Sequence, residues 1–62
     1  MKTESWEFYV DDTGLFRWRL MNGYGRITAM ALDGFSNRED CLEDARINGF
    51  AGDVTTLLFV TI

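Results

Sequence analysis

The chain has 62 residues, of which 47% are hydrophobic, and a net charge of −4 at pH 7. A chain this short forms one domain, residues 1–62, which is marginally stable without a good core, a cross-link or a partner chain. With one cysteine and no histidine, it has no internal disulfide, and we expect no structural zinc and no cofactor. The acidic balance disfavours nucleic acids and anionic membranes. No apolar run reaches the length of a membrane span and the start lacks a signal-peptide core, so we expect a cytoplasmic protein.

Two strands are predicted at the start of the chain, at residues 5–11 and 15–20, because apolar and polar residues alternate in both. Asp12-Thr13-Gly14 reads as a loop of three residues with Gly14 in the left-handed conformation, so that Asp11 faces Leu15. This register pairs apolar with apolar on one face and gives attractive pairs on the other. The predicted pairs are Val10–Phe16, Phe8–Trp18, Trp6–Leu20, Tyr9–Arg17 and Glu7–Arg19.

A third strand is predicted at residues 26–32, after a turn at residues 22–25. If Met21 faces Arg26, large residues of the second strand lie beside small ones of the third. The pairs are then Leu20–Ile27, Trp18–Ala29 and Phe16–Ala31. The two alanines leave room on the inner face for a helix.

The helix is predicted to begin at Ser36-Asn37-Arg38-Glu39, which matches a capping box with Ser36 as the N-cap. Gly49 is a typical stop signal. Between them an apolar stripe at helical spacing should face the sheet. The stripe consists of Cys41, Leu42 and Ala45.

The last strand is predicted at residues 54–62, where both faces are largely apolar. Such a strand needs cover on both faces and a neighbour on both edges, so we expect it to be central in its sheet. The fold class is therefore α+β with the order β-β-β-α-β, and a homodimer completes the sheet. The expected dimer interface comprises Val54, Thr56, Leu57, Leu58, Phe59, Val60 and Ile62.

Three segments resemble the small YegP-like family of unknown function. They are Gly14-Leu15-Phe16-Arg17-Trp18-Arg19-Leu20, Gly25-Arg26-Ile27-Thr28-Ala29 and Gly34-Phe35-Ser36. The chain departs from the family pattern at Tyr24, Ala31 and Phe35. The resemblance implies that two β-β-β-α-β units, from two chains or from tandem repeats, exchange their last strands. A side-by-side dimer is the alternative.

Catalytic and metal sites have weaker support than structural explanations of the same residues. Asp12-Thr13-Gly14 is the triplet of aspartic proteases, in which two loops share a proton, but it also suits a hairpin turn. The helix acids read as a solvated face rather than a calcium loop. Cys41 has no histidine to act as its base, so a buried structural thiol is expected.

The outer face of the sheet is the candidate binding surface. Arginines and a tyrosine on a sheet suit single-stranded nucleic acids, whereas cross-strand ion pairs and cation–π packing explain them structurally. We predict a non-enzymatic interaction module that forms a homodimer and has a possible protein partner. The alternatives are a small enzyme that uses Asp12 across the dimer and a weak single-strand binder. The candidate surface comprises Glu7, Tyr9, Arg17, Arg19, Thr28 and Met30.

Overall fold

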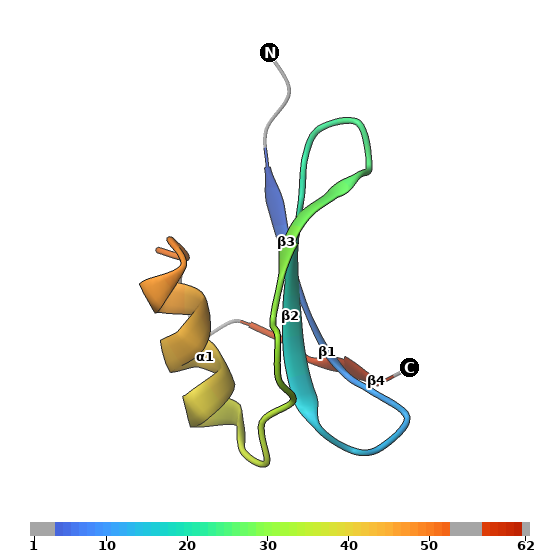
Figure 1. The fold of residues 1–62 in the computed structure, drawn as a ribbon, viewed down its shortest axis with the longest axis vertical. Helices are drawn as coiled ribbons and strands as arrows, with labels where there is room; N and C mark the ends of the chain where they lie inside the picture. The colour runs from blue at the N-terminus through green and yellow to red at the C-terminus, as the bar shows by residue number, and fades with distance from the viewer. Residues whose placement is uncertain (1–3, 53–56, 62) are drawn as a thin grey trace.

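A computed structural model describes residues 4–52 and 57–61 of the chain. Its elements are β1 (Ser5–Val10), β2 (Phe16–Met21), β3 (Ile27–Met30), α1 (Arg38–Ile47) and β4 (Val60–Thr61). The strands form one mixed sheet in the order β3-β2-β1-β4, and α1 covers one face of it (Figure 1). The predicted α+β class and order of elements are confirmed. Within the described ranges no helix has the length and apolar character needed to cross a membrane.

The β1–β2 hairpin has the predicted register at every position, from Ser5 opposite Met21 to Val10 opposite Phe16. Asp11 faces Leu15, to whose carbonyl its N–H donates at 3.0 Å. Gly14 has the predicted left-handed conformation, with φ at 83°. The turn and the two apolar faces therefore specify the same register.

The predicted register of β2 and β3 is wrong by one position at the turn and by two positions beyond a bulge. Asn22, rather than Met21, faces Arg26, and Asn22 N–H donates to the Arg26 carbonyl at 2.9 Å. Met21 then pairs with Ile27, and a bulge brings Ala29 opposite Leu20. In place of the predicted Trp18–Ala29 and Phe16–Ala31 pairs, Trp18 C=O accepts from Ala31 N–H and Phe16 bridges to Phe35.

The helix packs on the sheet through the predicted apolar stripe. Because a shift of two residues preserves the face of a strand, Ala29 and Ala31 still face the core. Phe8 and Trp18 supply the large side chains beneath the helix. The buried core of the described residues consists of Phe8, Trp18, Ala31, Cys41, Leu42 and Ala45.

The helix begins one residue later than predicted. Asn37 is the N-cap, and its side-chain oxygen accepts a hydrogen bond from Asp40 N–H at 2.8 Å. Asp40 Oδ2 in turn accepts from the Asn37 side-chain amide at 3.1 Å. The predicted capping box on Ser36 and Glu39 is therefore wrong. The predicted stop is confirmed, since the helix ends at Ile47 and Gly49 takes a φ of 111°.

The C-terminal strand is shorter than predicted in the described residues. Only Val60–Thr61 forms a strand there, and it pairs in parallel with Tyr9 and Val10. It lies at the edge of the sheet in the described chain, so the predicted central position is wrong for the single chain. Leu57–Phe59 has no strand pairing. The expected interface residues Val54, Thr56 and Ile62 lie outside the described part of the chain.

Candidate functional site

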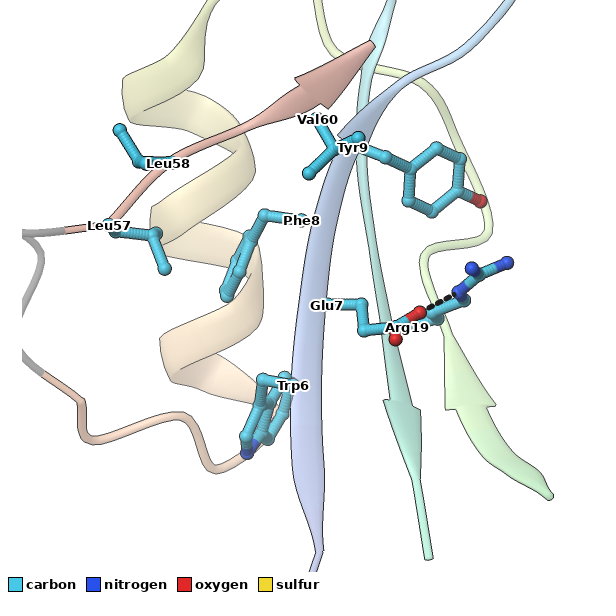
Figure 2. A pocket seen from close by; sticks show the side chains of 8 residues that line it. All are labelled: Trp6, Glu7, Phe8, Tyr9, Arg19, Leu57, Leu58 and Val60. Carbon is cyan, nitrogen blue, oxygen red and sulfur yellow. Dashed lines mark hydrogen bonds and ion pairs between the residues drawn. The ribbon is translucent and has the colours of Figure 1, made fainter. Parts of the chain in front are cut away.

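The structure offers two candidate binding regions, the outer face of the sheet and the edge of β1. Glu7, Tyr9, Arg17 and Arg19 alternate with the core residues of β1 and β2, so they lie on the face away from α1. Figure 2 shows Glu7, Tyr9 and Arg19 on this side. On β3, Met30 lies opposite Arg19. Thr28 lies in the bulge, where its hydroxyl donates to the Leu20 carbonyl at 3.3 Å.

The arginines of the outer face are held by carboxylates of the same sheet. Arg19 Nε lies 2.6 Å from Glu7 Oε1, in the pair that the register predicts, and its guanidinium lies 5.1 Å from the centre of the Tyr9 ring. Arg17 Nε lies 2.5 Å from Asp11 Oδ2. The second ion pair was not predicted, because Asp11 was assigned to the end of its strand and Arg17 to Tyr9. These ion pairs offset the positive charge that a phosphate backbone would contact.

Asp11 organises the first turn as well as the ion pair. Its Oδ1 accepts hydrogen bonds from the Thr13 hydroxyl at 2.6 Å, from Thr13 N–H at 2.9 Å and from Leu15 N–H at 3.0 Å. The pKa of Asp11 lies well below its usual range, chiefly because of the Thr13 hydroxyl, then Leu15 N–H and Arg17, with burial opposing. Asp12 is exposed in the turn. The Asp12-Thr13-Gly14 triplet therefore forms a hairpin turn, and the preceding residue, Asp11, holds this turn through its hydrogen bonds.

The cysteine and the helix acids have structural partners. Cys41 is fully buried, and burial raises the pKa of its thiol to about 11, with a smaller contribution from Asp44. Asp44 Oδ2 accepts a hydrogen bond from Trp18 Nε1 at 2.7 Å. This bond was not predicted, because Asp44 was assigned with the other helix acids to the solvated face of the helix. In the described ranges, no three potential metal ligands of the His, Cys, Asp and Glu types gather at one place.

A groove of about 320 Å³ runs beside the edge of β1 (Figure 2). In an antiparallel ladder, hydrogen-bonded residue pairs alternate with pairs that are not hydrogen-bonded. Because Asp11 and Leu15 form a hydrogen-bonded pair, Phe8 and Trp6 fall in the other kind of pair, and their backbone N–H and C=O groups point away from β2. In the described ranges, only Tyr9 and Val10 of β1 pair with β4. The groove therefore follows a sheet edge that is only partly closed. Its lining comprises Trp6, Glu7, Phe8, Tyr9, Arg19, Leu57, Leu58 and Val60.

The C-terminal segment, Leu57 to Thr61, is anchored by Phe59 and by Arg38. The Phe59 ring meets the Phe8 and Phe16 rings edge to face, with centroids 5.4 Å and 5.1 Å apart. Arg38 Nη2 donates to the Leu57 carbonyl at 3.1 Å, and its guanidinium lies 5.6 Å from the centre of the Phe59 ring. Leu58 and Val60 point outward and are 82% and 65% exposed. Among the predicted interface residues, Leu57 and Phe59 are therefore partly buried, whereas Leu58 and Val60 are exposed.

The chain matches no family model, no curated protein and no solved structure. The resemblance to the YegP-like family therefore rests on the three sequence segments alone.

Proposed function

We propose that the chain is a non-enzymatic interaction module that acts as a homodimer, in which residues 54–62 of each copy complete the sheet of the other. The observation that carries this proposal is the edge of β1. Among the residues that the structure describes, it is paired with β4 at Tyr9 and Val10 only, and an apolar groove runs beside it. An incompletely paired sheet edge is a ready template for a strand of another chain.

The outward apolar side chains of the C-terminal segment support the same proposal. Leu58 and Val60 are 82% and 65% exposed in the single chain. Full burial of such a side chain contributes about 1.5–3 kcal/mol, a large amount for a domain of 62 residues. A second copy that covers these residues would increase the stability of the domain. It would also remove exposed apolar side chains that favour aggregation.

The outer face is the surface that a further partner would contact. Arg17 and Arg19 are oriented by Asp11 and Glu7, so a partner meets paired charges beside the Tyr9 ring. This arrangement suits a protein surface with mixed polar groups better than a phosphate backbone. The free, buried Cys41 fits a reducing compartment such as the cytoplasm.

The dimer is tested by charging one exposed leucine at a time and measuring the mass in solution by light scattering. The wild type should have twice 7.1 kDa. Leu58→Glu should shift the mass toward the monomer, because the charge would be buried at the interface. Leu32→Glu is the matched control, since Leu32 is 93% exposed after β3, away from the β1 edge. A monomeric wild type, or a Leu58→Glu dimer as tight as the wild type, would contradict the proposal.

A further inference from the structure

A second, smaller cavity lies where the chain leaves β3 and passes the C-terminal half of α1. Its volume is about 140 Å³, below the roughly 300–1,000 Å³ of cavities that take a drug-sized molecule, so it suits a single side chain. We call it the acidic pocket, because Asp33 and Asp44 are its charged residues and no lysine or arginine of the described chain lines it. Its lining comprises Trp18, Met30, Leu32, Asp33, Phe35, Asp44 and Asn48.

The two carboxylates of the acidic pocket lack a cation. Asp33 is exposed and makes no hydrogen bond or ion pair with a described residue. Arg17, which lies within electrostatic range of Asp33, pairs with Asp11 instead. Asp44 Oδ2 accepts the Trp18 indole N–H at 2.7 Å, which fixes the carboxylate in place, while Oδ1 has no hydrogen-bond partner in the described part of the chain. The pocket therefore offers negative charge that the domain itself does not neutralise.

The lining decides which class of ligand fits. Two carboxylates repel an anion, and they are too few for a calcium ion, which takes about 6–8 oxygen ligands. Most of the other lining is apolar, with Phe35 half-buried and Met30 and Leu32 exposed. An apolar wall beside carboxylates suits the methylene stem and the cationic head of a long side chain. Of the two such side chains, arginine fits better, because a guanidinium stacks on aromatic rings and donates to carboxylates in a planar fork.

The acidic pocket adjoins an open edge of the sheet. Ala31 N–H donates to the Trp18 carbonyl at 2.9 Å, so the neighbouring Met30 belongs to a pair that is not hydrogen-bonded, and its backbone N–H and C=O point away from β2. Neither group has a partner among the described residues, in which β3 is an outermost strand. Met30 also lines the pocket. An extended segment that bonds to Met30 therefore brings its side chains next to the pocket.

We propose that the acidic pocket binds an arginine side chain of another protein, presented on an extended segment that pairs with the β3 edge at Met30. Main-chain bonds to the edge would supply affinity, and the pocket would select the cation. The net charge of −4 favours the approach of a basic partner. Because β3 and the β1 edge lie on opposite sides of the sheet, this site is separate from the proposed homodimer contact and does not depend on it.

The test is a nuclear magnetic resonance titration of the full-length, nitrogen-15-labelled protein with a five-residue peptide that carries arginine between threonine and valine residues. The Trp18 indole N–H and the Asp33 amide should shift, while the amides of Leu58 and Val60 beside the β1 edge should not. A peptide with citrulline in place of arginine has nearly the same shape without the charge, so its dissociation constant should be at least about tenfold higher. A lysine peptide should bind with intermediate strength.

Two variants assign the binding to the acidic pocket. Asp44→Asn retains an oxygen for the Trp18 indole N–H, and Asp33→Asn changes an exposed side chain, so both should fold and each should raise the dissociation constant at least about fivefold. Glu39→Gln is the matched control, since it removes the same charge from an exposed residue outside the pocket and should change binding by no more than about twofold.

Three results would overturn this inference. They are the absence of shifts in the wild type, equal binding of the arginine and citrulline peptides, and an effect of Glu39→Gln as large as that of the two pocket variants. None of them bears on the homodimer, whose mass is measured separately.

Discussion

Asp11 and Asn22 are the residues that shape the two hairpin turns, and they do so in the same way. Asn22 Oδ1 accepts hydrogen bonds from Tyr24 N–H and Arg26 N–H at 2.8 Å and 3.0 Å, as Asp11 does from the corresponding residues of the first turn. In both turns a glycine three residues later takes a left-handed conformation. A short acceptor side chain followed by such a glycine satisfies the turn's amides at little conformational cost.

Asp11 should make the stability of the protein depend on pH. Its pKa is depressed in the folded state, so the stabilisation that it provides is complete above the unfolded value of about 3.9 and decreases as the pH falls below it. Asp11→Asn should lower the thermal midpoint at neutral pH and flatten the acid limb of the stability curve. The measurement is thermal unfolding between about pH 2 and pH 6.

Asp12→Asn is the matched control for this prediction, because Asp12 is its exposed neighbour in the turn. It should leave the midpoint and the pH dependence close to those of the wild type. If the two variants unfold alike at every pH, the assignment of the turn and the ion pair to Asp11 is wrong.

The start of α1 gives a test at the scale of one element. Asn37→Ala removes the side chain that caps Asp40 N–H, so it should reduce the free energy of unfolding by about 1 kcal/mol. Ser36→Ala, at the residue that the sequence pattern favours as the cap, should have little effect. Urea denaturation of both variants at one protein concentration provides the comparison. A larger loss for Ser36→Ala would restore the capping box.

The first hairpin was predictable because two independent signals agree on it. The loop from Asp12 to Gly14 fixes which residues face each other, and the alternating faces allow that register alone. The second hairpin has the same turn chemistry, which would have set Asn22 opposite Arg26. Its bulge between Leu20 and Met21 had no signal of its own, since an inserted residue leaves apolar side chains near apolar neighbours.

The contacts that join distant elements were the least predictable part of the candidate site. The composition of the last strand indicates that it needs cover but does not identify its neighbour, so the parallel pairing with β1 and the contact of Phe59 with Phe8 were not predicted. The contact of Arg38 with Leu57 links residues far apart in sequence, for which a single chain carries no pattern. The outer pair of Glu7 and Arg19 was foreseen because it follows from one hairpin register.

At the scale of the whole molecule, the sheet formed by the described residues has one open edge at β3 and one partly closed edge at β1. The ion pairs of the β1–β2 hairpin lie on the outer face, while the exposed Leu58 and Val60 lie along the β1 edge. A small domain has few means of protecting such an edge apart from pairing it with another chain. The proposed exchange of last strands does this with a segment that the chain already carries.

The most direct test of the shared strand is an isotope-filtered nuclear Overhauser measurement on a dimer refolded from equal amounts of labelled and unlabelled chains. The filter retains only contacts between different chains. The Phe59 ring lies 5.4 Å and 5.1 Å from the Phe8 and Phe16 rings by centroid, so strand exchange predicts filtered cross-peaks from Phe59 to both. If these cross-peaks appear only within one chain, each copy keeps its own last strand, and the exchanged homodimer is wrong.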